Sequence, residues 1–173
     1  PMTRKTRTTT KNDMVARVEV SGLEPKTTYY YQVYVDDQPV LYTKPTFTTF
    51  PAKGQSGQST VVFTACSRYI PENESIWSLI EQRQPDAFLT LGDNLYIDTP
   101  QRYGKQRLHY YRRQLRPEYR AMTARTPIYA IWDDHDFGDN DVSGGLDPFK
   151  PKWKPRVWQV FKNNWNNPAY GGG

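Results

Sequence analysis

Side chains that can bind a metal follow three separate apolar stretches of the chain. The stretches cover residues 60–66, 85–93 and 127–132, and each has the composition of a β-strand buried on both faces. The groups at or just beyond their ends are a thiol, a phenol, two carboxylates and an imidazole, on Cys66, Tyr96, Asp93, Asp134 and His135. Thiolate, imidazole and carboxylate groups are common metal ligands. If the three strands are neighbours, the pattern predicts a metal site.

The third of these strand ends is crowded with like charges. Residues 133–141 read DDHDFGDND and contain five aspartates and one histidine. Carboxylates held close together repel one another unless a positive charge lies among them, so a bound cation would explain the cluster. The alternatives are a plain solvent-facing loop and a structural calcium loop. Residues 139–144 match the first half of an EF-hand loop, but Lys150 stands where the EF-hand glutamate belongs, so we reject that motif.

The elements between the stretches must bring these groups together. Residues 74–84 and 111–122 have helical spacing, and Pro117 is expected to divide the second of these helices. The resulting β-α-β-α-β order predicts an α/β fold with parallel strands and right-handed crossovers, whose carboxyl ends meet at one edge of the sheet. The apolar side of the first helix is expected to be Ile76, Leu79 and Ile80, and an amphipathic C-terminal helix is expected to bury Trp158, Phe161 and Trp165.

The first 51 residues have a different pattern. Strands are expected over residues 15–20, 29–35 and 45–51, of the roughly seven that a fibronectin type III-like sandwich needs. The spacing before Tyr29 suggests the corner in which a tyrosine hydroxyl returns to the backbone upstream. We therefore expect residues 1–51 to be the C-terminal strands of a β-sandwich module. A linker at 52–59 and part of a catalytic domain at 60–173 are expected to follow.

Charge and composition narrow the possible partners. The net charge is +5, and residues 102–125 carry eight Lys and Arg against a single acid, Glu118. This basic block fits either an anion-binding stripe or a solvated helix face; we favour the face and predict no stable nucleic-acid partner. The single cysteine excludes an intramolecular disulfide. No apolar run reaches about 18 residues, so no transmembrane segment is expected. Neither end has the character of a natural terminus, and we expect an internal fragment.

Three motifs together resemble a known family. ACSR, PDAFLTLGDNLYID and IWDDHDFGDND are similar to segments of the PhoD-like alkaline phosphatases, within the calcineurin-like metallophosphoesterase superfamily. The resemblance implies part of a metallophosphoesterase α/β sandwich preceded by part of a fibronectin type III-like β-sandwich. It also implies metal-dependent hydrolysis of phosphate mono- or diesters by a dinuclear site with a bridging hydroxide. The parent protein would then be periplasmic, on the cell surface or secreted.

The resemblance also implies roles for single residues. Asp93 would be shared between two metals, Tyr96 would give a phenolate to Fe(III), and Cys66 would supply a thiolate. Asp134 would bind the second metal, Ca(II) or another divalent ion, and His135 would be the catalytic histidine. Two further residues are candidates for contact with the phosphate ester, Asn94 and Arg68.

One part of the family pattern is missing. The later Asp and His pair that closes the family's site has no counterpart, because no histidine follows His135. We therefore expect the 173 residues alone to bind metal weakly and to hydrolyse phosphate esters poorly. A polyanionic substrate such as teichoic acid, nucleic acid or a phospholipid headgroup stays open. The alternative is a non-enzymatic β-sandwich binding module with a structural cation in its acidic loop.

Overall fold

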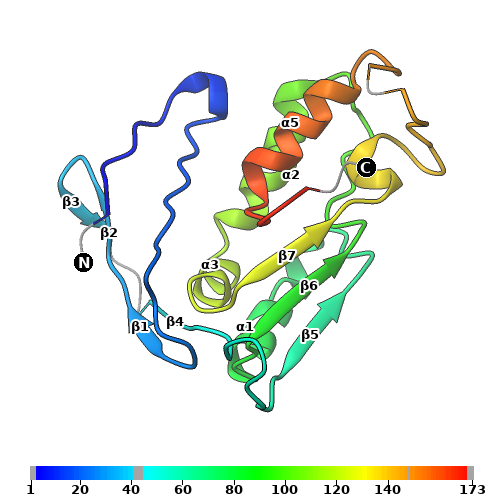
Figure 1. The fold of residues 1–173 in the computed structure, drawn as a ribbon. Helices are drawn as coiled ribbons and strands as arrows, with labels where there is room; N and C mark the ends of the chain where they lie inside the picture. Colours follow the sequence, from blue (N-terminus) through cyan, green and yellow to red (C-terminus); the bar gives the residue numbers. More distant parts are fainter. Residues whose placement is uncertain (1–2, 41–44, 148, 171–173) are drawn as a thin grey trace.

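The computed structural model describes residues 3–40, 45–147 and 149–170. Its central element is a three-stranded parallel sheet in the order β5-β6-β7, formed by β5 (Val61–Thr64), β6 (Ala87–Leu91) and β7 (Ile128–Ile131) (Figure 1). Helix α1 (Ile76–Gln82) connects β5 to β6, and α2 (Tyr103–Gln114) with α3 (Pro117–Thr123) connects β6 to β7. The predicted α/β fold with its β-α-β-α-β order is confirmed.

Proline divides the second connection as expected. Pro117 stands in the first turn of α3, where its missing N–H group has no helical partner to lose, and Arg116 before it is extended. Helices α2 and α3 are therefore two separate elements.

Helix α1 buries a different face from the one predicted. Ile76 and Leu79 are exposed, whereas Trp77 is buried beside Ile80. The Trp77 ring packs edge-on against Phe88 at 6.1 Å between ring centroids. Its Nε1 donates a hydrogen bond to the buried Glu74 at 2.7 Å, so the largest ring takes the inner position because its polar atom finds a partner there.

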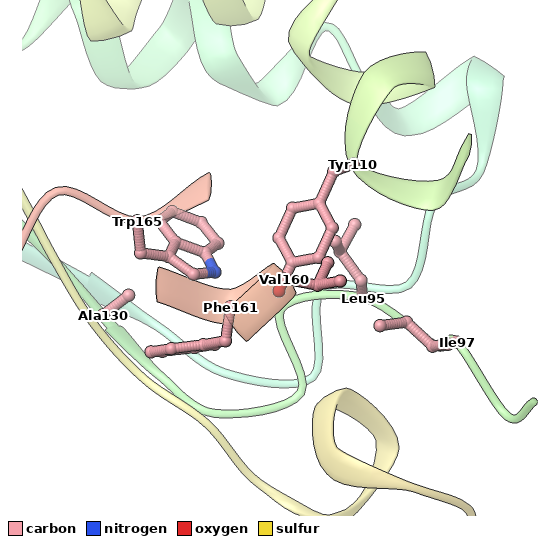
Figure 2. Close-up of a cluster of buried hydrophobic side chains, with 7 residues drawn as sticks. All are labelled: Leu95, Ile97, Tyr110, Ala130, Val160, Phe161 and Trp165. Carbon is pink, nitrogen blue, oxygen red and sulfur yellow. The ribbon is translucent and has the colours of Figure 1, made fainter. Parts of the chain in front are cut away.

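Helix α5 (Lys154–Asn164) lies beside α2 and closes the second part of the core (Figure 1). Phe161 and Trp165 are buried as predicted, and Trp158 is half-buried. Burial of side chains of this size contributes about 1.5–3 kcal/mol each. The cluster in Figure 2 consists of Leu95, Ile97, Tyr110, Ala130, Val160, Phe161 and Trp165. Two of its members, Leu95 and Ile97, come from the segment after β6, so the core also holds that loop in place.

The opposite face of the sheet is open. Phe63 and Ile131 are 69% and 58% exposed, and Val61, Leu91 and Tyr129 on the same face are exposed as well. The prediction that these strands are buried on both faces is therefore wrong for the residues that the structure describes. Parallel sheets are normally covered on both sides, so this face has the composition of an interior surface without a covering layer.

The N-terminal part forms two small antiparallel pairs. Strand β1 (Thr28–Tyr30) pairs with β4 (Thr46–Thr48), and β2 (Val33–Val35) pairs with β3 (Gln38–Val40). The predicted tyrosine corner is confirmed, since Tyr29 Oη accepts a hydrogen bond from the N–H of Glu24 at 2.8 Å.

Two of the expected strands differ from the observed ones. Residues 15–20 form no strand, and the strand expected over 29–35 is broken into β1 and β2. Strand β3 was missed. It follows a two-residue turn in which Asp36 and Asp37 have φ of 49° and 62°, a conformation that aspartate tolerates better than most residues.

The N-terminal segment is anchored to the helices by one buried carboxylate. Asp13 follows the short helix η1 (Thr10–Asn12) and is 4% exposed. It forms an ion pair with Arg107 of α2 at 2.9 Å. It also accepts hydrogen bonds from the hydroxyl of Tyr103 at 2.6 Å and from Nδ2 of Asn163 at 3.0 Å. This contact joins the N-terminal segment to both α2 and α5.

The basic block is only in part the expected solvated helix face. Arg102, Lys105 and Arg120 are exposed, whereas four other arginines of the block form ion pairs within the molecule. Arg113 is 4% exposed and forms a two-pronged ion pair with Glu74, which lies between η2 (Pro71–Asn73) and α1. His109 is half-buried, not exposed as expected. Arg107, Arg116 and Arg125 of the block also form ion pairs, with Asp13, Glu118 and Glu81.

The substitution Arg113→Met is expected to lower the free energy of unfolding by about 3–5 kcal/mol, because it leaves the Glu74 carboxylate buried without a compensating charge. Urea denaturation followed by circular dichroism measures this. Arg102→Met, at an exposed position just before α2, is the matched control and should change stability by less than about 0.5 kcal/mol. Equal effects of the two substitutions would contradict the structural role of Arg113.

Candidate metal site

The ends of the three parallel strands bring the predicted ligands together. The Sγ atom of Cys66 lies 3.6 Å from Oδ2 of Asp93, and the hydroxyl of Tyr96 lies 3.2 Å from the same oxygen. Asp93, Asp134 and His135 each offer one ligand atom, and these atoms lie within 4.8 Å of one another. Four side chains from the three strand ends thus surround the carboxylate of Asp93.

The loop after β6 owes its shape to a glycine. Gly92 has φ of 98°, and a Cβ atom there would lie 2.6 Å from the Cβ of Asp133, so only glycine fits. Asp93 itself is in the left-handed region at φ 51°, which aspartate adopts more readily than most residues. This sharp turn directs the Asp93 side chain away from the strand axis and into the cluster.

The loop after β5 is bound to the loop after β6 through the backbone. The N–H of Cys66 donates to the carbonyl of Gly92 at 3.3 Å, and the N–H of Ser67 donates to the carbonyl of Asp93 at 2.9 Å. Cys66 also has a positive φ of 53°. Because these bonds continue the pairing of β5 and β6 past the last strand residue, they place the thiol beside the Asp93 carboxylate.

The acidic run after β7 begins as one turn of helix, α4 (Asp134–Phe137), which the sequence did not indicate. Asp133 caps it, because its Oδ1 accepts the N–H of Asp134 at 2.9 Å. Asp139 and Asp141 are exposed. Only one aspartate of the run, Asp134, belongs to the cluster with Asp93, so local structure explains part of the accumulation of acids.

Asp136 is the residue of this run that the sequence reasoning missed. It is 1% exposed, and its carboxylate accepts N–H groups from Asn94 at 3.0 Å, Leu95 at 2.8 Å and Asp133 at 3.2 Å. Burial raises the pKa of Asp136, while these N–H groups act in the opposite direction by stabilising the carboxylate. Asp136 therefore joins the loop after β6 to the loop after β7.

The phenol of Tyr96 is held in its neutral form. Burial, followed by the charge and hydrogen bond of Asp93 and the contact with Cys66, raises the pKa of Tyr96 to about 12. A neutral phenol donates to Asp93 Oδ2, as observed. A nearby cation would reverse this preference, because it stabilises the phenolate and the carboxylate together.

The imidazole of His135 is oriented by a second residue that the sequence reasoning missed. Nδ1 of His135 lies 2.6 Å from Oδ1 of Asp98, and the ring stacks on Tyr96 with 4.1 Å between centroids. Burial opposes protonation of His135, but the hydrogen bond and charge of Asp98, with Asp93 and Asp134, outweigh it and raise its pKa. An acid five residues after Asp93 was the only available signal for Asp98.

Asp134 is kept ionised by backbone N–H groups. Its Oδ2 accepts the N–H of Asp141 at 2.5 Å and its Oδ1 accepts the N–H of His135 at 2.9 Å. The bond from Asp141 is the largest influence and lowers the pKa of Asp134, against the smaller effect of burial. Asp134 is thus a carboxylate held in position by backbone donors, which suits a metal ligand.

The two candidate substrate contacts lie in different surroundings. Asn94 is 2% exposed, and its Nδ2 donates to the carbonyl of Ile131 at 2.8 Å and to Asp136. This side chain therefore connects the loop after β6 to the end of β7 and to α4. The side chain of Arg68 is 61% exposed and lies over the Tyr96 ring at 4.7 Å, with Asp98 at 3.9 Å. Only Arg68 therefore faces the open side of the cluster.

The donor set fits a cation. Oδ1 of Asp93 is buried and has no hydrogen-bond partner among the described residues, although the other oxygen of the same carboxylate is contacted by Cys66 and Tyr96. A buried carboxylate oxygen without a donor is costly unless a positive charge satisfies it. The residues that would hold such an ion are Cys66, Asp93, Tyr96, Asp134 and His135.

The substitution Asp136→Asn is expected to lower the free energy of unfolding by about 2 kcal/mol at pH 8, because it places an amide N–H₂ where backbone N–H groups already point. Urea denaturation measures the change. Asp139→Asn, an exposed substitution in the same run, serves as the control and should alter stability by less than about 0.5 kcal/mol. A loss of stability confined to Asp139→Asn, or absent from both variants, would show that Asp136 does not hold the loops after β6 and β7 together.

The substitution Asp98→Asn is expected to lower the pKa of His135 in the metal-free protein, since it removes the carboxylate that favours the imidazolium. The raised pKa of the wild type means that this interaction stabilises the fold at pH below the unfolded value near 6.5 and is lost as pH rises through the folded value. The variant should therefore lose stability at acidic pH only.

Proton NMR titration of the ring signals resolves this, because the chain has two histidines. The signals of His109 are told apart from those of His135 because burial, with the charges of Arg112 and Lys105, lowers the pKa of His109 to about 4. A His135 titration curve that does not move in Asp98→Asn would show that Asp98 has no influence on the ring.

Comparison with known proteins agrees with this geometry. Residues 61–162 match the family described as PhoD-like phosphatase. The chain is 30% identical over 145 residues to alkaline phosphatase D of Bacillus subtilis (strain 168), which covers 71% of this chain and 24% of that protein. The chain thus spans about a quarter of the length of this curated relative.

A solved structure described as "Structure of PhoD" superposes with a TM-score of 0.69 and 19% identity, over 88% of this chain and 34% of that one. At this identity the superposition concerns the fold alone. The family match covers more than half of the chain and includes all three strand ends that form the cluster. The chain belongs to the PhoD-like phosphatase family.

Proposed function

We propose that this chain supplies part of the active site of an enzyme that hydrolyses phosphate mono- or diesters with the help of a dinuclear metal centre. The observation that carries the proposal is the unpartnered, buried Oδ1 of Asp93 at the centre of a thiol, a phenol, a carboxylate and an imidazole. Membership of the PhoD-like phosphatase family supports it. Because the chain spans a quarter of its curated relative, further ligands would come from other parts of the whole protein.

The donors suit two different ions. Cys66 and Tyr96 offer soft or strongly basic anionic groups on one side of Asp93, which favour a trivalent iron. Asp134 offers a hard carboxylate oxygen on the other side, which favours calcium or another divalent ion. When bound, such a pair would supply a bridging hydroxide as nucleophile and positive charge for the phosphoryl group.

The chain's own residues would bind and orient the substrate. The exposed guanidinium of Arg68, held against the Tyr96 ring, is placed to bind a phosphate oxygen. His135 lies at the same opening, and because Asp98 accepts from its Nδ1, its Nε2 is the nitrogen left to interact with the leaving oxygen. Asp98 would act as a positioning residue in this arrangement.

The alternative is a binding module with a structural cation. A structural calcium site uses oxygen ligands and has no need of a thiol or a phenol. The contact of both Cys66 and Tyr96 with one oxygen of Asp93 therefore favours the enzyme.

The resemblance further suggests a location outside the cytoplasm for the whole protein. No helix among the described residues has the length and apolar character needed to cross a membrane. The proposed partner is a phosphate ester substrate, and no stable nucleic-acid complex is proposed.

The substitution Tyr96→Phe tests the metal centre. The wild-type chain loaded with Fe(III) should absorb visible light through tyrosinate-to-iron charge transfer, and the variant should lose this band. Calorimetry in two buffers should also show fewer protons released on metal binding by the variant, because the neutral phenol of the wild type must ionise.

Tyr34→Phe, at an exposed position on β2, is the matched control and should keep both the colour and the proton release. A colourless wild-type protein would remove the iron assignment, and a chain that bound no Fe(III), Ca(II) or Mn(II) would remove the metal centre. Hydrolysis of p-nitrophenyl phosphate is expected to be slow for this chain alone.

A further inference from the structure

We propose that Tyr69, His109 and Arg112 form a second anion-binding subsite beside the metal cluster, which takes a further phosphate group of a substrate with more than one phosphate. This inference rests on the proposed function, because it concerns which phosphate esters that site would favour. It favours a substrate that carries a second phosphate close to the reacting one over a simple monoester.

Arg112 differs from its neighbours in having no acidic partner. Arg107, Arg113 and Arg116 each form an ion pair with a carboxylate. No carboxylate oxygen of the described residues lies within 4.0 Å of the Arg112 guanidinium. The charge of Glu74 acts on Arg112, but Glu74 is already paired with Arg113, whose own positive charge opposes that of Arg112. The Arg112 guanidinium is therefore left to pair with an anion from outside the chain.

The guanidinium of Arg112 is nevertheless held in one place. It lies over the ring of Tyr69 with its Cζ atom 4.4 Å from the ring centroid, and its Nη2 is 3.0 Å from Nδ1 of His109. Since arginine has no acceptor, His109 accepts this bond and must be neutral. Burial and the charges of Arg112 and Lys105 lower the pKa of His109 to about 4, which keeps the imidazole neutral at physiological pH. A pre-positioned guanidinium binds phosphate at a smaller entropic cost than a free one.

The subsite lies next to the metal cluster. Tyr69 follows Cys66 by three residues on the loop after β5. Arg113, whose guanidinium is 5.8 Å from the same ring, donates to the carbonyl of Asn94, the residue after Asp93. The Asp98 carboxylate, which contacts His135, also acts on the pKa of His109. These contacts place Tyr69 and Arg112 close to the metal cluster, on the side of α2.

The geometry suits a phosphate group in particular. A guanidinium forms paired hydrogen bonds with two oxygens of one phosphate, which a lysine ammonium does not. With one phosphate at the metal cluster and Arg68, a neighbouring phosphate along the substrate would reach Arg112. The exposed Arg102 and Lys105 on the same helix would add only general attraction for anions.

Binding of inorganic tripolyphosphate to the metal-free chain tests the subsite without the metal cluster. Isothermal calorimetry and the NMR shifts of the His109 ring report on it. We expect tripolyphosphate to shift the His109 signals, and Arg112→Gln to weaken binding by about tenfold or more, as loss of a charge-assisted contact implies. The matched control Arg102→Gln removes the same charge from an exposed position and should change the affinity by less than about twofold.

Two further variants separate contact from charge and folding. Arg112→Lys keeps the charge without the planar fork and should also weaken binding, whereas Tyr69→Phe keeps the ring beneath the guanidinium and should bind as the wild type does. Circular dichroism verifies that each variant is folded. Equal losses of affinity in Arg112→Gln and Arg102→Gln would overturn the subsite. So would the absence of tripolyphosphate binding to the wild type at about 10 millimolar, which is roughly tenfold above typical weak substrate affinities.

This experiment is independent of the test of the metal centre. A chain whose tyrosinate-to-iron band is lost in Tyr96→Phe, but in which Arg112→Gln and Arg102→Gln bind tripolyphosphate equally, keeps the proposed function and loses the subsite. A chain that binds tripolyphosphate through Arg112 but binds no metal keeps the anion subsite and loses the phosphatase assignment.

Discussion

The arrangement of this site depends on the buried carboxylate of Asp136. It accepts N–H groups from Asn94 and Leu95 in one loop and from Asp133 in the next. Charge-assisted hydrogen bonds in a buried environment are among the stronger polar interactions of a protein, and they are directional. They set the distance between the loop that carries Asp93 and the turn that carries Asp134, so the carboxylates of the candidate metal site are held in position by the protein itself.

Further polar contacts connect these loops to the surrounding helices and side chains. Arg113 connects the carbonyl of Asn94 to the buried Glu74, and Glu74 in turn accepts from Trp77 of the first helix. On the open side, Asp98 orients the ring of His135. Among the described residues, the buried Oδ1 of the Asp93 carboxylate has no hydrogen-bond partner, and neither has the neighbouring amide Oδ1 of Asn94. A buried carboxylate oxygen without a donor is a feature expected of a ligand position.

The two faces of the sheet are covered unequally. One face is packed by α1, α2, α3 and α5, whereas the other presents Phe63, Ile131 and their neighbours to solvent. The ligands lie at the carboxyl ends of these strands, where α/β sheets place their sites, and this position does not need the second face to be covered. The cluster can thus be assembled by the described residues even though the sheet has the composition of a fully enclosed one.

The sequence by itself determined the class of fold, the three strand ends and the metal-binding residue types, because apolar periodicity and the motifs around Asp93 and Asp134 are local properties. Tertiary structure decided the rest. Which aspartate joins the cluster around Asp93, which supports the loop and which contacts His135 depends on burial and on partners distant in the chain, as for Asp98 and Asp136. The ion pairs of the arginines could not be predicted from the sequence either. The composition of α2 is the same whether a guanidinium contacts a buried carboxylate or not.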